Sequence, residues 1–318
     1  MAKKLDAVLG RTWTTYMGSV DGALRKAGWW DEEMFLLMGM TGMAFHFIIH
    51  ATACPSSVTV YDWGAEHFTM LDRIGIHNEV VVVMNISSLN TRRQVQEDVL
   101  AKVRTSIDKG LPVIIWAPTE LLEFGLITGY DDGDQVLYVQ DCMNSNPAPL
   151  SYVNLGFSEV PVLFVQIIKG RVDVDREKIY LESLKYALGE WNKEQHITPG
   201  YASGRKAYAN LIGTLERGDY DPFGLVYILN TYAEAKAYAA KYLEHVARKS
   251  RELKGLEEAS RLSLQVAQGF QKIVGLAPFK GPGREPFDHG NAPAILDLLR
   301  QCFDLEERAM AEVQRVLA

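Results

Sequence analysis

The fold of the first half of the chain is decided by residues 110–141, which read GLPVIIWAPTELLEFGLITGYDDGDQVLYVQD. Three apolar runs of strand length lie in this stretch, at Pro112 to Trp116, Phe124 to Tyr130 and Gln135 to Gln140. The cluster Asp131-Asp132-Gly133-Asp134 separates the last two runs, and Asp-Gly between apolar segments is a strong signal for a tight β-hairpin. The stretch therefore predicts antiparallel strands joined by a hairpin.

Helices and further strands are predicted on both sides of this stretch. Residues Thr91 to Lys109 have a candidate N-cap and apolar side chains at helical spacing, and Gly110 ends the helix. The run Glu79 to Met84 is apolar and has the length of a strand buried on both faces. The remaining elements are expected as helices at Ser19 to Gly28 and Asp31 to Met40, and as strands at Ser57 to Tyr61 and Pro161 to Ile168.

The second half of the chain is predicted to be helical. After about residue 170 the sequence is rich in Ala, Leu, Glu, Lys and Arg, with apolar residues at helical period. Helices are expected at Glu177 to Trp191, Arg205 to Glu216, Leu225 to Lys249, Arg251 to Val274 and Ala292 to Leu317, with Gly255 interrupting or kinking the fourth. The stretch Leu276 to Pro293 is rich in proline and glycine and is expected to be a loop. We therefore predict an α+β domain with an antiparallel sheet at residues 1–172 and an all-α domain at residues 173–318.

Composition and charge exclude several classes of protein. The 318 residues include 33 Lys or Arg and 40 Asp or Glu, which gives a formal net charge of −7. A general nucleic-acid binder needs a basic surface to neutralise phosphate, so we expect no nucleic-acid partner. The most apolar stretch, Met34 to Ile49, is shorter than the roughly 20 residues of a membrane span. The N-terminus lacks the apolar core of a signal peptide, and three cysteines match neither a disulfide framework nor a zinc motif. We expect a cytoplasmic protein without a membrane partner.

The order of these elements resembles a known family. It is similar to the papain-like domains of bacteriocin-processing peptidases and of the butirosin-biosynthesis acyltransferase of the protein H type. The resemblance covers most of the chain and rests on Gly110-Leu111-Pro112-Val113 and on Leu126-Ile127-Thr128-Gly129-Tyr130-Asp131-Asp132. It implies a papain-like α+β domain followed by an α-helical domain. It also implies a cysteine at a helix start, a histidine opening the strand that runs into Gly-Tyr-Asp, and an aspartate closing the next strand.

The chain departs from this family at two of the three catalytic positions. The resemblance places Ser19 at or near the cysteine position and Glu123 at the histidine position, whereas Asp141 matches the family aspartate. Glutamate is a much weaker base towards an alcohol than histidine is, and a serine beside a carboxylate lacks the close pKa match of a thiolate–imidazolium pair. The positions Ser19, Glu123 and Asp141 therefore form the predicted site, but papain-type acyl chemistry is not expected there.

The hairpin also yields a prediction about Glu123 and Asp141. A three-residue loop with Gly133 in the left-handed conformation would set Glu123 directly opposite Asp141, and we favour it because it reproduces the His–Asp adjacency of the resembled family. A two-residue turn would set Glu123 opposite Cys142 instead. Two opposed buried carboxylates would couple electrostatically, and the alternative is that both face solvent or cap nearby backbone.

The residues predicted to bind the ligand are Tyr16, Gly42, Phe124 and Cys142. We expect open space for a ligand beside Glu123, because Gly125 and Gly129 would share its face of the strand. The neighbouring carboxylate of Asp141 is expected to raise the pKa of the Cys142 thiol and to make it less reactive.

Two other clusters have two interpretations each. Gly39-Met40-Thr41-Gly42 lacks the lysine and the preceding strand of a phosphate loop, so close backbone packing is favoured over ligand contact. His46, His50 and Cys54 recur at a spacing of four and are metal-ligand types, yet a half-buried segment is the favoured interpretation. Cys54 as a nucleophile partnered by one of these histidines is a further alternative to a small buried residue. We predict no metal and no cofactor.

Three functions follow from these observations. The favoured one is a degenerate papain-like protein that binds a small molecule or a peptide in the former active-site cleft, without cysteine-protease activity. The alternative is an acyl- or aminoacyl-transferase, or an amide hydrolase, of a secondary-metabolite pathway that uses Glu123 and Asp141, with or without Ser19. The third is an assembly role in which the helical half forms a homodimer interface. In each case we expect that no thiol carries essential chemistry.

Overall fold

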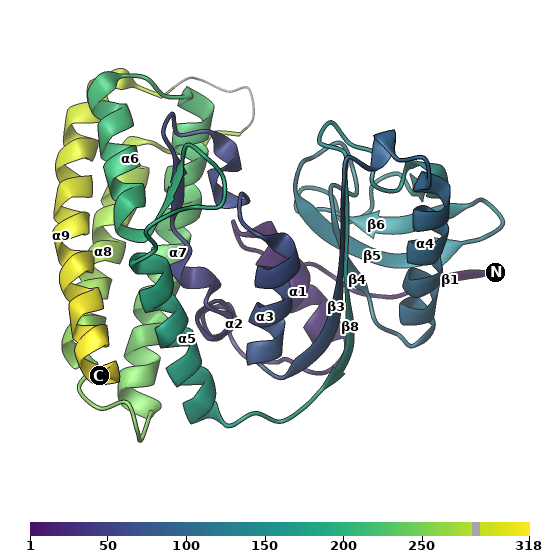
Figure 1. Cartoon of the computed structure of the whole chain (residues 1–318), viewed down its shortest axis with the longest axis horizontal. Helices are drawn as coiled ribbons and strands as arrows, with labels where there is room; N and C mark the ends of the chain where they lie inside the picture. The colour runs from purple at the N-terminus through teal and green to yellow at the C-terminus, as the bar shows by residue number, and fades with distance from the viewer. Residues whose placement is uncertain (282–286) are drawn as a thin grey trace. The chain divides into compact units, whose positions relative to one another are not determined.

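The chain forms two compact units in a computed structural model that describes residues 1–281 and 287–318 (Figure 1). Unit 1 comprises Met1–Glu33 and Trp63–Asp173, and unit 2 comprises Met34–Asp62 and Val174–Ala318. The segment Met34–Asp62 thus belongs to unit 2, although the predicted division places it in the domain at residues 1–172. Its partner strand lies about 150 residues further along the chain, and no local sequence pattern encodes so distant a pairing.

Unit 1 is built on one antiparallel sheet. The strand order is β3-β8-β4-β5-β6-β7, and β1 pairs with β5 beside the end of β4. The strands are β1 (Ala2–Lys4), β3 (Ile76–Met84), β4 (Val113–Trp116), β5 (Phe124–Asp131), β6 (Val136–Gln140), β7 (Leu150–Ser151) and β8 (Val162–Arg171). The helices are α1 (Thr15–Lys26), α3 (Trp63–Arg73) and α4 (Arg92–Asp108), with short 3-10 turns η3 (Ile86–Ser88) and η4 (Tyr152–Asn154).

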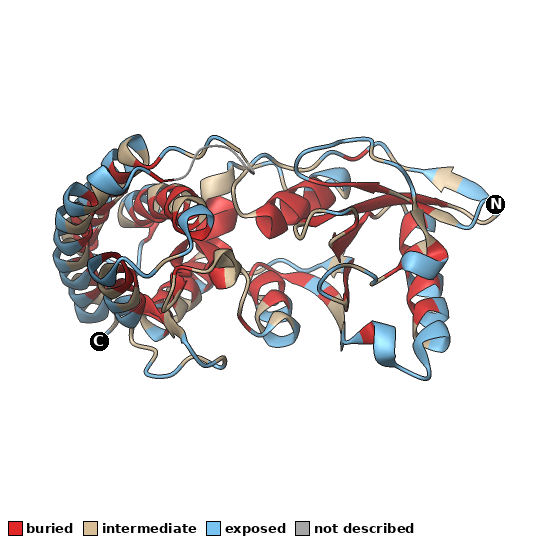
Figure 2. Ribbon diagram, turned by 90° about the horizontal axis from the view of Figure 1, so that it is seen from above, coloured by how far each residue is buried: buried red, intermediate tan, exposed pale blue. Residues whose placement is uncertain are grey.

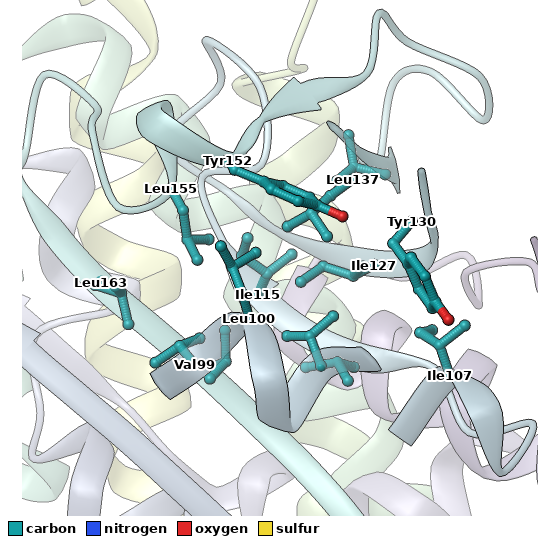
Figure 3. Close-up of a cluster of buried hydrophobic side chains, with 14 of the residues drawn as sticks. Val99, Leu100, Ile107, Ile115, Ile127, Tyr130, Leu137, Tyr152, Leu155 and Leu163 are labelled. Carbon is teal, nitrogen blue, oxygen red and sulfur yellow. The ribbon is translucent and has the colours of Figure 1, made fainter. Parts of the chain in front are cut away.

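The two faces of this sheet are covered by different helices. Helix α4 covers one face, where its Val99, Leu100 and Ile107 meet Ile115 and Ile127 of the strands in a buried apolar cluster (Figure 3). The helical spacing of apolar residues in α4 is what places these side chains on one stripe. Helix α1 lies against β5 on the other face, which carries the candidate site.

The predicted register of the β5–β6 hairpin is wrong in both of its alternatives. Asp131 lies opposite Val136, so Asp132–Gln135 forms a four-residue loop, and the pairing shifts at a bulge between Ile127 and Gly129. The left-handed residue of the loop is Gln135 (φ 54°) rather than Gly133, whose N–H donates to Asp131 Oδ1 at 2.9 Å. Glu123 therefore does not lie directly opposite Asp141 or Cys142 in the sheet.

Unit 2 is helical apart from a two-stranded ribbon, β2 with β9. Its helices bury one side and expose the other, as Figure 2 shows by colour. The longest helix of the unit, α7, packs more extensively against α8 than against any other element. The elements are α2 (Met34–Thr41), η1 (Met43–Phe45), β2 (Ile48–His50), η2 (Pro55–Val58), α5 (Arg176–Trp191), β9 (Tyr201–Ser203), α6 (Gly204–Arg217), α7 (Pro222–Lys249), α8 (Glu257–Leu276), η5 (His289–Asn291) and α9 (Ala292–Leu317).

The sequence predictions for individual elements are mostly confirmed. The predicted strand at Ser57 to Tyr61 is wrong, because Pro55 opens a 3-10 turn in which Ser57 Oγ donates to the Cys54 carbonyl at 2.6 Å. Helix α8 begins after Gly255 (φ 90°), which interrupts the predicted helix from Arg251. Helix α3 is not predicted, and part of the predicted loop at Leu276 to Pro293 lies outside the described residues. Within residues 1–281 and 287–318, no helix is both long and apolar enough to cross a membrane.

Candidate functional site

The start of α1 brings a hydroxyl against Glu123. Thr15, the first residue of the helix, donates from Oγ1 to Glu123 Oε2 at 2.6 Å and accepts the backbone N–H of Phe124 at 3.2 Å. Gly18 and Gly22 of α1 permit residues 8–10 to cross the helix closely, since a Cβ at either glycine would overlap a backbone carbonyl there. The helix start is thereby held between the N-terminal segment and the entrance to β5.

Ser19 does not take part in this contact. It lies one turn further along α1, is fully buried, and donates its hydroxyl to the Thr15 carbonyl at 2.9 Å. A serine hydroxyl bonded to the carbonyl four residues earlier is a common arrangement within a helix. The structure therefore places Thr15, which sequence reasoning missed, at the helix start beside Glu123. The adjacent Thr14-Thr15 pair before the apolar Tyr16-Met17 is the signal that could have indicated it.

Asp141 follows β6 directly and is buried by its own loop. Its Oδ1 accepts the backbone N–H groups of Met143 and Asn144, each at 2.7 Å, and its Oδ2 accepts the Thr119 hydroxyl at 2.7 Å. The carboxylate thus caps nearby backbone, which is the alternative stated for it above. It fixes the turn that carries Cys142 and ties that turn to the loop between β4 and β5.

Cys142 is exposed, yet its thiol has a high pKa. Loss of surrounding water to neighbouring protein atoms raises the pKa to about 12, with further contributions from the negative charges of Glu123 and then Asp141. The contribution of Asp141 has the sign expected from the sequence. Both carboxylates therefore lie near this sulfur, and the thiol is protonated at neutral pH.

Tyr16 and Phe124 form part of a buried aromatic layer next to the Thr15–Glu123 contact. The Tyr16 ring stacks on His67 with centroids 3.7 Å apart, and its hydroxyl donates to Gln166 Oε1 at 2.9 Å. The Phe124 ring lies 4.9 Å from Trp116 and 5.1 Å from Trp63. Burial raises the pKa of Tyr16 far above its usual value, so its hydroxyl stays protonated. Tyr16 and Phe124, both predicted to bind the ligand, are therefore fully buried and pack next to the Thr15–Glu123 contact.

The predicted open space at the two glycines of β5 is not present. A Cβ at Gly125 would overlap the Gln140 carbonyl, and a Cβ at Gly129 would overlap the Lys3 carbonyl. These glycines instead allow the neighbouring strands β6 and β1 to approach β5 closely.

Gly42 belongs to unit 2, where it links α2 to η1 with a φ of 89°. The neighbouring Gly39 faces the ring of Tyr242, which a Cβ would overlap. Close packing, the favoured interpretation of the Gly39–Gly42 segment, therefore holds at Gly39.

His46, His50 and Cys54 are bonded to other residues of unit 2. His46 Nε2 contacts the Tyr186 hydroxyl, His50 Nδ1 contacts Thr52 Oγ1 at 2.9 Å, and Cys54 Sγ contacts Ser56 Oγ at 2.9 Å. No group of three or more His, Cys, Asp or Glu side chains that could hold a metal ion occurs in the described part of the chain.

Comparison with known proteins identifies no family for this chain: no family model matches it, and no curated protein matches its sequence. The contacts of Thr15, Glu123, Asp141 and Cys142 are therefore the basis for a function.

Proposed function

We propose that unit 1 binds a small molecule or a peptide through Glu123, in a degenerate papain-like site without thiol chemistry. The observation that carries the proposal is the 2.6 Å contact between Thr15 Oγ1 and Glu123 Oε2. Thr15 opens α1, Glu123 directly precedes β5 and Asp141 directly follows β6. These are the places at which the resembled families carry their cysteine, histidine and aspartate.

The chemistry of these groups favours binding over catalysis. The nearby thiol of Cys142 is protonated at neutral pH because its pKa is raised to about 12. Asp141 already accepts three hydrogen bonds from its own unit and therefore acts as a positioning residue. Glu123 is half-buried, and a carboxylate in that setting makes strong charge-assisted hydrogen bonds to ammonium, amide or hydroxyl donors.

A binding screen with a charge-neutral variant tests the proposal. Primary amines, amino acids and short peptides are screened against the full chain by saturation-transfer NMR, and each binder is titrated calorimetrically. We expect Glu123→Gln to weaken binding by about 10- to 100-fold, the loss of one hydrogen bond to a charged group. The matched control is Glu120→Gln, which removes an exposed carboxylate three residues away and should leave affinity unchanged. Equal affinity for the wild-type protein and Glu123→Gln would contradict the proposal.

The Thr15–Glu123 contact also supports a second candidate, an acyl- or aminoacyl-transferase or an amide hydrolase. A hydroxyl within hydrogen-bond reach of a carboxylate is the arrangement of a nucleophile and its base. In this alternative Thr15 takes the role that the sequence assigned to Ser19, and Asp141 orders the neighbouring turn. With p-nitrophenyl acetate as acyl donor, Thr15→Ser should keep turnover and Thr15→Val should abolish it. Turnover that survives in folded Thr15→Val would exclude this candidate.

A further inference from the structure

Strand β3 forms an open edge of the sheet in unit 1. It stands at the end of the strand order and, among the described residues, pairs with β8 alone (Figure 1). It is nine residues long, and alternate backbone N–H and C=O groups on its outer side have no strand partner there. Such an edge is a template for one more strand.

The central segment of β3 lacks the features that usually protect an edge. Val80–Met84 contains no charge and no proline, and the irregular pairing of the strand lies earlier, between His77 and Asn78. The four valines are each half-buried, and Met84 is 61% exposed. Natural edge strands are commonly blunted by lysine, proline or a bulge, so this segment is suited to pairing.

The charge that borders the segment is already compensated. Glu79 forms ion pairs with Lys102 of α4, at 2.5 Å, and with Lys169 of β8. These two lysines hold the pKa of the Glu79 carboxyl below its usual value through hydrogen bonds, against a smaller opposing effect of burial. A strand arriving at this edge therefore does not meet an uncompensated carboxylate.

We propose that two copies of the chain associate through antiparallel pairing of β3 with β3, about a two-fold axis at Val82. Residues opposite each other in an antiparallel pair both turn their backbone groups inward or both outward. When β3 pairs with β3 of a second copy, residues that lie opposite each other must therefore have residue numbers that differ by an even number. One residue then lies on the two-fold axis. Because each copy uses the same strand edge for the contact, the assembly is complete as a dimer.

An axis at Val82 makes the uncharged segment complementary to itself. Val82 then meets the partner's Val82, Val81 meets the partner's Val83, and Val80 meets the partner's Met84. Glu79 lies beyond the last pair, because the strand ends at Met84 and Asn85 turns away with a φ of 52°. No carboxylates therefore oppose each other, and every paired apolar side chain faces an apolar one. An axis at Val81 would place Glu79 opposite the partner's Val83. This self-complementarity is the reason to assign the edge to a second copy, since β-branched cross-strand pairs stabilise a sheet.

Disulfide formation across the axis tests the register. In the full chain with the exposed thiol removed by Cys142→Ser, Val82→Cys should give a covalent dimer under mild oxidation. Val81→Cys should not, because the two Val81 positions would be roughly 8 Å apart, beyond the reach of a disulfide of about 7 Å. Absence of the Val82→Cys dimer, or equal cross-linking at both positions, would overturn the proposal.

Sedimentation equilibrium provides the second measurement. The wild-type chain should shift from one copy to two as concentration rises, and Val82→Lys should raise the dimer dissociation constant at least tenfold. The control Val153→Lys places the same charge at an exposed site in η4 and should leave association unchanged. A monomer at every concentration, or a dimer that Val82→Lys does not weaken, would overturn the proposal. Where Val82→Lys does not fold, the cross-link decides the question.

Discussion

The reactivity of Cys142 follows from its surroundings, where neighbouring protein atoms displace water and raise the pKa of the thiol, and two nearby carboxylates raise it further. We expect it to react with iodoacetamide far more slowly than an ordinary exposed thiol at pH 7, because its pKa is raised to about 12. The rate should increase steadily as the pH rises towards 12. Mass spectrometry of peptides labelled at different times gives the rate at this one residue.

A charge variant tests the contribution of Glu123 to this slow reaction. Of the two neighbouring carboxylates, Glu123 has the larger effect on this thiol. Glu123→Gln removes its charge, so the pKa of Cys142 should fall and labelling at pH 8 should become faster. Glu120→Gln is the matched control and should leave the rate unchanged. Fast labelling of wild-type Cys142 at pH 7 would contradict the assignment of a protonated thiol.

Gly39 of α2 is expected to tolerate no side chain. Gly39→Ala would push a methyl group into the ring of Tyr242, and overpacking of this kind costs about 1–3 kcal/mol. Gly189→Ala in α5 is the matched control, because no atom lies within 4 Å of its added Cβ. That variant should gain roughly 0.5–1 kcal/mol from helix propensity. Urea unfolding measures both changes, and a stable Gly39→Ala would contradict the packing described here.

The hydroxyl that meets Glu123 belongs to Thr15 and not to the predicted Ser19. Helix α1 begins at Thr15, after the N-cap Thr14, so the Thr14-Thr15 pair was the available sequence signal for its start, although Thr14 makes no side-chain capping bond. A start predicted four residues later assigns Ser19 to the role, since residues four apart lie on one face of a helix. Glu123 and Asp141 could be placed at strand ends because their neighbours have clear strand character.

Among the elements, α5 is connected to the C-terminal end of α7 by Glu177, a carboxylate in its first turn. Glu177 accepts hydrogen bonds from the Ser250 hydroxyl at 2.5 Å and from the Arg251 backbone N–H at 2.8 Å. Burial alone would raise the pKa of Glu177, but these hydrogen bonds outweigh it and the pKa is lowered. The stabilisation is therefore present above the unfolded-state pKa and is lost as pH falls through the folded-state pKa.

We expect Glu177→Gln to reduce the free energy of unfolding by about 1–3 kcal/mol at pH 7. The difference from the wild-type protein should shrink as the pH falls below the ordinary glutamate pKa of about 4.5 and then through the lowered folded-state pKa, because the carboxylate is then protonated in both states. Guanidinium unfolding at a series of pH values measures it. Glu257→Gln, at an exposed residue in the first turn of α8, is the control and should give the wild-type profile. A pH-independent difference would contradict the role given to the ionised carboxylate.

The β5–β6 hairpin shows that strands could be predicted from the sequence whereas the register between them could not. Both strands follow from their apolar runs, but the register depends on one bulge and on the conformation of one loop residue. Thr128 is displaced at the bulge, and Gln135 takes the left-handed conformation that Gly133 was expected to take. A shift of this size changes which side chains meet across the strands.

At the scale of the whole molecule, unit 2 is assembled from two stretches of chain. Ile48 of β2 lies opposite Ser203 of β9, and the Tyr232 hydroxyl donates to the Ile48 carbonyl at 2.9 Å. Phe47 is buried against Tyr208, with ring centroids 4.7 Å apart. Helix content could be predicted locally for this unit, whereas its inclusion of residues 34–62 depends on contacts between distant positions.

We therefore expect residues 173–318, produced alone, to lack a cooperative thermal transition. Without residues 34–62 the fragment loses the strand paired with β9 and the apolar side chains buried around Phe47. Joining residues 34–62 to residues 174–318 through a Gly/Ser linker should restore the transition. Circular dichroism melts compare the two, and a cooperative melt of residues 173–318 alone would contradict this assignment.

Because unit 2 is assembled from two distant stretches of chain, its two parts are synthesised at different times. During synthesis, residues 34–62 leave the ribosome roughly 7–30 s before β9 at about 5–20 residues per second. In that interval unit 1 can close, because its last strand ends at Arg171, while Phe47, Ile48 and Ile49 still lack the side chains that bury them. The early apolar segment is thus the part of the nascent chain with the longest wait for its partners, and the part best suited to recruit a chaperone.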